Sequence, residues 1–261
     1  WAGSRKNLNN SVEKKTGIIK KILDFQRHRG PDATGIWKEK GSPVVLGHNR
    51  LSIIELSEAG SQPMPSSDGR WLISYNGELY NYKLIRQNLE KKFGIVFKGN
   101  SDTEVFLYGF LNYGVDEFLR IADGMFSAAI YDLKEDELFL MRDRVGEKPL
   151  FFSKTGDELF FASELKGLAC SISSETRVDI TGLQLYLLLR YVPAPYTILK
   201  NIFKLKAGHY LRFRSGRSIQ QIPYYSWDPH ASEIPPNQAN YKEVVKGVES
   251  FLVKSLESRL M

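Results

Sequence analysis

The sequence predicts an α+β fold, because its strand-like and helical segments fall into separate groups along the chain. Two predicted helices in succession divide three early strands from a run of four later strands. Polar turns separate those four strands, so each can pair with its neighbour. This grouping suggests two antiparallel sheets with helices on their outer faces.

The elements of the first half follow from apolar spacing and from helix-end signals. Ile18, Ile22 and Phe25 give the first helix one apolar face. Gly94 can end the second helix. Ser101 resembles the capping residue of the third helix. The first half is therefore predicted to form helices over 12–29, 82–93 and 101–113 and strands over 34–38, 44–47 and 71–75.

The second half begins with the four strands and ends with a helical pattern. The Val-Pro-Ala-Pro segment at 192–195 stops one helix, and the proline-rich run 221–238 suits a connector. Val248 and Leu252 belong to an apolar face at helical spacing near the end of the chain. The second half is predicted to form strands over 125–133, 137–142, 150–153, 158–162 and 209–213 and helices over 181–191 and 241–261.

Composition excludes several classes of function. The 261 residues are 42% hydrophobic and 25% charged, which is typical of a soluble globular protein. Basic residues are spread along the chain and the net charge is +6, so no nucleic-acid partner is expected. No apolar stretch is long enough to cross a membrane. The single cysteine fits a reducing compartment, so we expect a cytoplasmic protein. The histidines show no ligand spacing, so no metal is expected.

The segment 74–82 carries the clearest chemical signal. The predicted strand 71–75 ends in Asn76-Gly77-Glu78. Such an Asn-Gly pair is most often a hairpin turn. The Asn76 side-chain NH2 and the Gly77 backbone N–H are also the two kinds of donor that an oxyanion hole needs. The sequence therefore leaves two interpretations of this segment, a turn and a catalytic donor pair.

Eight motifs in a fixed order narrow this choice. They are Arg27-His28-Arg29-Gly30-Pro31-Asp32, Gly47-His48-Asn49-Arg50-Leu51-Ser52-Ile53, Gln62-Pro63-Met64, Tyr75-Asn76-Gly77-Glu78-Leu79-Tyr80-Asn81, Ser101-Asp102-Thr103-Glu104, Gly124-Met125-Phe126-Ser127-Ala128-Ala129, Arg142-Asp143-Arg144-Val145-Gly146-Glu147-Lys148-Pro149-Leu150 and Phe161-Ala162-Ser163-Glu164-Leu165-Lys166. Over residues 2–214 the chain closely resembles the glutaminase domain of glutamine-hydrolysing asparagine synthetases of the B type. These are class II glutamine amidotransferases with the N-terminal-nucleophile hydrolase fold. The resemblance implies an αββα sandwich of two antiparallel sheets.

The resemblance also implies a site for L-glutamine. Asn76 and Gly77 match the oxyanion-hole donors. Arg50 matches the residue that grips the substrate α-carboxylate, which suits a bidentate guanidinium. Asp102 matches the carboxylate that pairs with the α-ammonium, and Glu78 sits where a second polar contact is made. Without the resemblance, Arg50 would be interpreted as a surface cation. Asp102 is expected to cap a helix in either case, which does not exclude contact with a ligand.

The nucleophile that the resemblance implies lies outside this sequence. In such proteins the mature chain opens Cys-Gly-x-Ala-Gly, and its own α-amine is the base. Trp1-Ala2-Gly3 places that cysteine two positions before Trp1, so the chain as written should be inactive as a glutaminase. Ser4 lacks a free amine, and Cys170 is expected to be a small buried residue.

Three parts are expected along the chain: the glutaminase domain over 1–214, a linker over 215–240, and the first helix of a truncated α/β synthetase domain over 241–261. Both ends look cut, because the chain starts at Trp1 and stops at Met261 inside a helical pattern. The resemblance implies that the synthetase domain would use ATP and Mg2+ to activate a carboxylate, aspartate in the type case. No cofactor is expected before residue 261. A homodimer is a further assembly that the resemblance implies.

Alternatives to this interpretation stay open. Relatives of this kind also amidate sugars or other carboxylates in cell-surface and antibiotic pathways. Others resemble β-lactam synthetase and keep the domain as a silent scaffold. The Arg142-Asp143-Arg144 loop is expected to be a structural ion-pair loop rather than a catalytic one.

Overall fold

A computed structural model describes residues 5–39, 42–52, 55–172, 177–215, 217–227 and 240–260. The helices are α1 (Arg5–Phe25), α2 (Tyr82–Phe93), α3 (Asp102–Tyr113), α4 (Val115–Ile121), α5 (Leu165–Ile172), α6 (Ile180–Leu189) and α7 (Tyr241–Glu257), with short 3-10 turns η1 (Arg27–Arg29) and η2 (Glu58–Gly60). The strands are β1 (Ala33–Lys38), β2 (Val45–Arg50), β3 (Met64–Pro65), β4 (Trp71–Leu79), β5 (Gly124–Asp132), β6 (Glu137–Arg142), β7 (Phe151–Thr155), β8 (Glu158–Ala162), β9 (Phe203–Lys204), β10 (His209–Arg214) and β11 (Gln220–Pro223). Within these ranges no helix combines the length and the apolar character needed to cross a bilayer.

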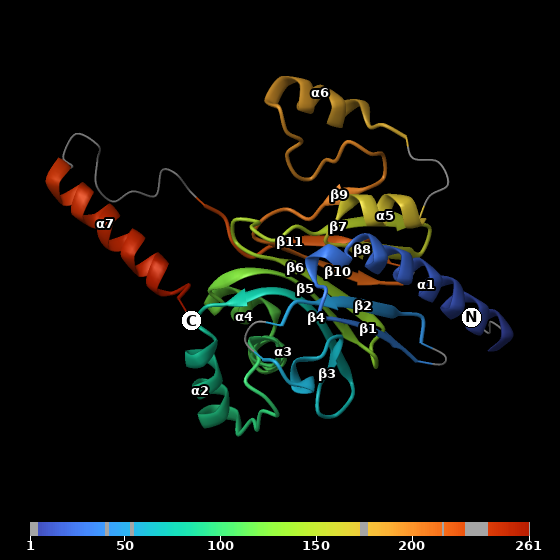
Figure 1. Ribbon diagram of the computed structural model, residues 1–261, viewed down its shortest axis with the longest axis horizontal. Helices are drawn as coiled ribbons and strands as arrows, with labels where there is room; N and C mark the ends of the chain where they lie inside the picture. Colours follow the sequence, from blue (N-terminus) through green and yellow to red (C-terminus); the bar gives the residue numbers. More distant parts are fainter. Residues whose placement is uncertain are drawn as a thin grey trace.

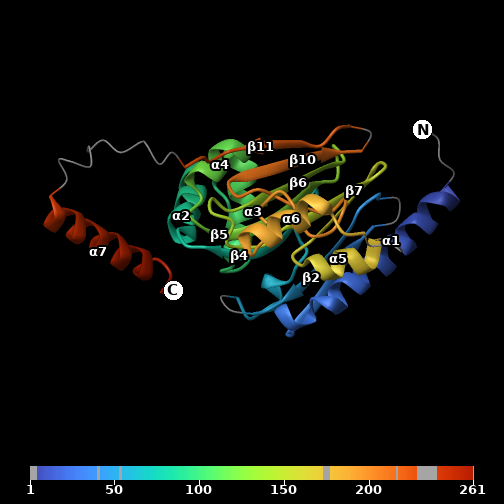
Figure 2. The ribbon, with the colours of Figure 1, turned by 90° about the horizontal axis from the view of Figure 1, so that it is seen from above.

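The molecule is built in four layers (Figure 1). A six-stranded sheet has the order β11-β10-β6-β5-β4-β3, and α2, α3 and α4 cover one of its faces. Its other face packs against β2 and β7. Helices α1 and α5 lie outside these strands and close the sandwich (Figure 2). The predicted αββα arrangement is confirmed.

Two apolar cores hold the layers together. Phe106 of α3 lies at the centre of the first core, where its ring contacts those of Tyr75, Phe118 and Phe126 edge-on or tilted. The second core lies between the two β-layers and contains Tyr131, which is almost fully buried. Fully burying a side chain of this size typically stabilises a fold by about 1.5–3 kcal/mol. Alternating apolar residues on β5 contribute side chains to both cores, because successive side chains of a strand point to opposite faces.

The second β-layer differs from the prediction of two sheets. It consists of two separate sheets, β1-β2 and β8-β7-β9, beside the six-stranded one. Every strand pair in the described part of the chain is antiparallel, as expected. The short partners β3 and β9 were not expected, because two-residue strands carry no alternation that a sequence pattern can reveal.

Several predicted elements agree closely with the structure. Helix α2 ends at Gly94, which adopts the left-handed conformation (φ 66°) that suits glycine. Ser101 caps α3 by accepting from the Thr103 N–H, so the cap is Ser101 and not Asp102. Helix α4 was missed, because Gly114 between α3 and α4 was not recognised as a junction. Cys170 on α5 is exposed, which contradicts its expected burial.

The end of the chain lies beside the sandwich. Strand β11 falls inside the predicted linker 215–240 and pairs with β10. Helix α7 begins at Asn240, whose side chain accepts from the Lys242 N–H, and it agrees with the predicted last helix. None of its residues is buried, and it lies apart from the layers (Figure 1).

Candidate functional site

The Asn76-Gly77-Glu78 segment lies inside a strand and not in a turn. Strand β4 continues to Leu79, and its register with β5 pairs Asn76 with Ser127 and Gly77 with Phe126. The predicted end of this strand at residue 75 is therefore wrong. A run of paired β5 residues extends β4, and this long-range pairing overrides the local turn preference of Asn-Gly.

Gly77 is required at its position by packing. A Cβ atom there would lie 2.3 Å from the Met125 carbonyl oxygen and 2.7 Å from the Phe126 Cα. Both are backbone atoms of β5, so they cannot move aside as a flexible side chain could. The glycine therefore lets the two strands approach closely while leaving its own N–H unobstructed by a side chain.

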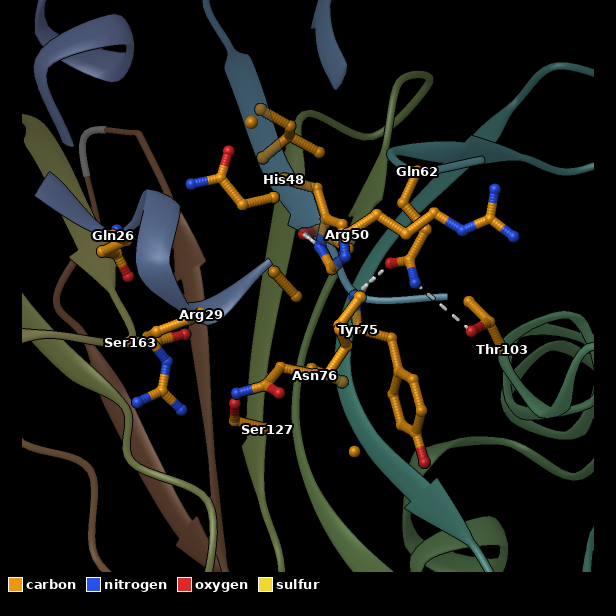
Figure 3. A pocket seen from close by; sticks show the side chains of 18 of the residues that line it. Gln26, Arg29, His48, Arg50, Gln62, Tyr75, Asn76, Thr103, Ser127 and Ser163 are labelled. Atoms are coloured by element: carbon orange, nitrogen blue, oxygen red, sulfur yellow. Dashed lines mark hydrogen bonds between the residues drawn. The ribbon is translucent and has the colours of Figure 1, made fainter. Parts of the chain in front are cut away.

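One cavity of about 470 Å³ brings the predicted site residues together. Its volume lies within the usual range of small-molecule sites, about 300–1,000 Å³. It is bounded by α1, β2, the end of β4, the start of α3 and the end of β8. The predicted site residues among those that line it are Arg50, Asn76, Gly77, Glu78 and Asp102. Residues from three separate motifs thus share one pocket (Figure 3).

Two carboxylates lie on one side of this cavity. Asp102 is 5% exposed, and its Oδ2 accepts from the Leu79 N–H at 3.0 Å. Burial raises the pKa of the Asp102 carboxyl from 3.8 to about 6, and the nearby Glu78 carboxylate adds to the rise. Two neighbouring acids repel each other and favour a cation between them. This side of the cavity is suited to an ammonium group.

The buried hydroxyl of Tyr75 lies close to this acidic pair. Burial, and secondly the Asp102 carboxylate, raise the pKa of the Tyr75 hydroxyl well above its usual value. The hydroxyl has no hydrogen-bond partner at standard distance among the described residues. It therefore remains a neutral polar group beside the carboxylates.

Arg50 is the last residue of β2 and lines the cavity. Its guanidinium donates to the carbonyl oxygens of Ser57, at 3.0 Å, and of Glu55. A guanidinium carries five N–H donors, so these two contacts leave others for a ligand. The structure thus places Arg50 in the predicted pocket, anchored to the loop 55–60.

His48 is a site residue that the sequence did not single out for chemistry. Its Nδ1 lies 3.2 Å from the Ser74 hydroxyl, and both side chains line the cavity. Burial, with a smaller contribution from Arg50, lowers the pKa of His48 from 6.5 to about 4. The ring is therefore neutral at physiological pH and joins β2 to β4 without adding charge.

The Arg142–Leu150 motif supports the cavity from the β6–β7 side. Asp143 is almost fully buried and accepts hydrogen bonds from five backbone N–H groups, four of them in its own loop and the fifth at Phe126. Arg142 donates to three carbonyl oxygens. Backbone contacts therefore hold this loop, in place of the predicted ion pairs. The loop presents Lys148 to the cavity.

Gln62 and Thr103 also line the cavity and were not predicted as site residues. Gln62 Oε1 accepts from the Tyr75 N–H at 2.6 Å, and its Nε2 donates to the Thr103 hydroxyl at 3.3 Å (Figure 3). Gln62 belongs to the Gln62-Pro63-Met64 motif and Thr103 to the Ser101-Asp102-Thr103-Glu104 motif, and this membership was the sequence signal that could have indicated them. In the described part of the chain no group of three His, Cys, Asp or Glu residues is arranged to hold a metal ion.

Cys170, the cysteine of α5, is not among the residues that line the cavity. Trp1 and Ser4, on which the expectations about the nucleophile depend, lie outside the described residues.

Comparison with known proteins shows the family of this chain. A family model described as a glutamine amidotransferase domain matches residues 5–225. A putative glutamine-hydrolysing asparagine synthetase of Mycobacterium bovis is 33% identical, with 92% of this chain and 38% of that protein covered. A second one, from Methanocaldococcus jannaschii, is 34% identical, with 93% of this chain and 49% of that protein covered. The chain therefore spans about half or less of the length of these relatives.

The solved structure of glutamine phosphoribosylpyrophosphate amidotransferase from Bacillus subtilis is similar in fold. It superposes with a TM-score of 0.57 at 18% identity, covering 80% of this chain and 46% of that one. At this identity the likeness concerns the fold, which is that of the N-terminal-nucleophile hydrolases. The family match over residues 5–225 and the relatives at 33% and 34% identity lead to one conclusion: the chain belongs to the class II glutamine amidotransferase domain family.

Proposed function

We propose that this domain hydrolyses L-glutamine to glutamate and ammonia for an ATP-dependent amidation carried out by a second domain. The observation that supports this most directly is the distribution of charge in one cavity. A guanidinium, two carboxylates and an amide-bearing strand all line a pocket of about 470 Å³. A free amino acid needs a cation for its carboxylate and an anion for its ammonium, placed apart.

The proposed binding mode assigns one task to each group. Asp102 and Glu78 hold the α-ammonium, and Arg50 binds the α-carboxylate through its remaining N–H donors. The side-chain carbonyl of glutamine then points at the Asn76 amide and the Gly77 N–H. These donors stabilise the negative charge that develops on the carbonyl oxygen, and losing one such donor typically costs about 3 kcal/mol of barrier.

The proposed nucleophile is a cysteine two positions before Trp1. Its thiolate attacks the amide carbon, its α-amine takes up the thiol proton, and that proton leaves with ammonia. Water then attacks the thioester and releases glutamate. That position lies upstream of Trp1, the first residue of the printed sequence.

The amidation itself is proposed for a partner domain that follows residue 261. In the type case it would use ATP and Mg2+ to activate aspartate, and ammonia would pass to it directly. The two asparagine synthetase relatives support such a partner domain, because the matched region covers only 38% of one and 49% of the other. A homodimer and a cytoplasmic location belong to the same proposal.

The decisive experiment restores the proposed nucleophile. The chain is produced with Cys-Gly placed before Trp1 and with the initiator methionine removed, and ammonia release from glutamine is measured. We expect turnover from this protein but none from the unextended chain or from a Ser-Gly version. A Cys-Gly chain that folds and binds glutamine but releases no ammonia would contradict the proposed chemistry and favour the silent-scaffold alternative.

A second experiment tests the role of Arg50 in the full-length gene product. Arg50→Ala should abolish glutamine-dependent synthesis and leave ammonia-dependent synthesis intact, because only the former needs the α-carboxylate contact. Equal loss of both activities would show that Arg50 does not act in glutamine capture.

A further inference from the structure

Gln62 links two elements that each supply part of the proposed glutamine site. It lies in the loop between β2 and β3 and uses both ends of its amide. The oxygen accepts from the Tyr75 N–H of β4, and the nitrogen donates to the Thr103 hydroxyl on the first turn of α3. One neutral side chain thus ties the edge of β4 to the start of α3 (Figure 3).

The part of β4 to which Gln62 binds is an open strand edge. Strand β3 pairs with β4 only at Leu72 and Ile73, whereas β5 pairs with the other edge as far as Leu79. Backbone N–H groups of alternate residues in a strand point to the same side. The N–H groups of Tyr75 and Leu79 are bonded to side chains and not to β5, so both face the open edge.

This alternation determines where the Gly77 N–H points. Gly77 lies midway between Tyr75 and Leu79, so its N–H faces the same open edge. Gln62 occupies the N–H on one side of it, and Asp102 occupies the N–H on the other. Two side chains therefore bracket the proposed oxyanion donor and leave it between them.

The same two contacts join the start of α3 to β4, in addition to the packing of the helix in the first core. Asp102 attaches the start of the helix to Leu79, and Thr103 attaches it to Gln62. With the second contact, the Asp102 carboxylate is held at a constant position relative to the Gly77 N–H.

We propose that Gln62 is a positioning residue of the glutamine site, which holds the ammonium-binding carboxylate of Asp102 and the Gly77 N–H in one fixed geometry. This inference rests on the proposed function and deepens it. In the proposed binding mode Gln62 has no contact with the reacting carbonyl or the nucleophile. It acts through the two groups that do the binding, and a displacement of about 1 Å in such groups can lower a rate about 100-fold.

The test uses the Cys-Gly-extended protein and two variants that break the link from opposite ends. Gln62→Met keeps the length of the side chain and removes both polar groups. Thr103→Val keeps the shape of the side chain and removes the hydroxyl. Each should lower kcat/KM for glutamine at least tenfold, with kcat falling more than KM rises, because the oxyanion contact is made in the transition state.

A conservative variant and a double variant distinguish a positioning role of Gln62 from a purely structural one. Thr103→Ser retains the hydroxyl and should keep kcat/KM within about twofold of the parent. The double variant Gln62→Met/Thr103→Val should be no worse than the more impaired single variant, because both changes remove one link. Tyr108→Phe is the matched control, because its hydroxyl ties the same helix to the Ser67 N–H on a loop away from the cavity. It should lower the melting temperature and leave kcat and KM unchanged.

Several results would overturn the inference. If Gln62→Met and Thr103→Val lower the melting temperature but leave kcat and KM of the folded protein within twofold of the parent, the link is structural only. If Gln62→Met does not fold, Thr103→Val alone decides between the same outcomes. A parent protein with no glutamine turnover and no glutamine binding by calorimetry would refute the proposed function, and this inference with it. If the parent protein binds and turns over glutamine and the variants have the same kcat and KM, the inference about Gln62 is refuted and the proposed function is not.

Discussion

Replacing Asp102 by asparagine should stabilise the fold and weaken the site. Burial raises the pKa of the Asp102 carboxyl from 3.8 to about 6. A shift of about two pKa units corresponds to roughly 3 kcal/mol, which is the cost of keeping the ionised carboxylate in the folded protein at neutral pH. Asparagine keeps an oxygen that can accept from the Leu79 N–H and carries no charge. We therefore expect Asp102→Asn to gain up to about 3 kcal/mol in the free energy of unfolding at pH 7.

The pH dependence of the free energy of unfolding shows whether the gain comes from removing the buried charge of Asp102. Well below pH 3.8 both folded and unfolded Asp102 are protonated, so the charge cost is absent. Between about pH 4 and 6 the unfolded chain ionises first, and the free energy of unfolding of the wild type falls as pH rises. Urea denaturation from pH 4 to 8 should show the gain of Asp102→Asn growing over this interval and then levelling off.

The same variant should bind glutamine roughly 10- to 100-fold more weakly, because a hydrogen bond to a charged group contributes about 1.5–3 kcal/mol. Asp179→Asn is the matched control. Asp179 caps α6 through the Gly182 N–H and is only half-buried, and asparagine is an equally good N-cap. A gain for Asp102→Asn that is equal at pH 4 and pH 7, or a loss of stability at pH 7, would refute the reasoning.

Three further predictions follow from individual contacts. Gly77→Ala should destabilise the fold by about 1–3 kcal/mol or prevent folding, because the added Cβ meets the backbone of β5, and urea denaturation measures this. His48, whose pKa burial lowers to about 4, is neutral in the folded protein but protonates in the unfolded chain as pH falls below about 6.5. His48→Gln should therefore lose less stability between pH 6.5 and 4.5 than the wild type, and parallel pH profiles of the two proteins would contradict this. Asp143→Ala removes the carboxylate that accepts from five backbone N–H groups, of which only that of Gly146 keeps a second acceptor among the residues that the structure describes, the Asp143 carbonyl; it should cost at least about 3 kcal/mol and lower the melting temperature by several degrees.

Local sequence signals predicted the elements that depend on short-range chemistry. The helix over 82–93 was predicted from apolar spacing and from Gly94, and the structure has that helix and that cap. The cap at Ser101 follows from the same kind of reasoning, because a side-chain oxygen two residues from an N–H needs no distant partner. The short strands β3 and β9 were not predicted, because they are strands by virtue of their pairing partners and not of their own residues.

The site was predictable in composition but not in geometry. Asn76, Gly77 and Glu78 were expected at the end of a strand, whereas they lie within β4 beside β5. Cys170 was expected to be buried, whereas the way α5 packs against α1 leaves it exposed. In both cases a neighbour far away in sequence decided the outcome.

The sequence by itself determined which charged and polar groups the chain carries, in what order, and where α2 and the capped start of α3 lie. Those properties depend on side-chain chemistry and on hydrogen bonds within a few residues. Only the tertiary structure decided that β3 stops after two residues, that the edge of β4 beyond it is open, and that Gln62 and Asp102 bind on either side of Gly77. Such pairings form between segments tens of residues apart, so their geometry depends on how whole layers pack, which no local pattern encodes.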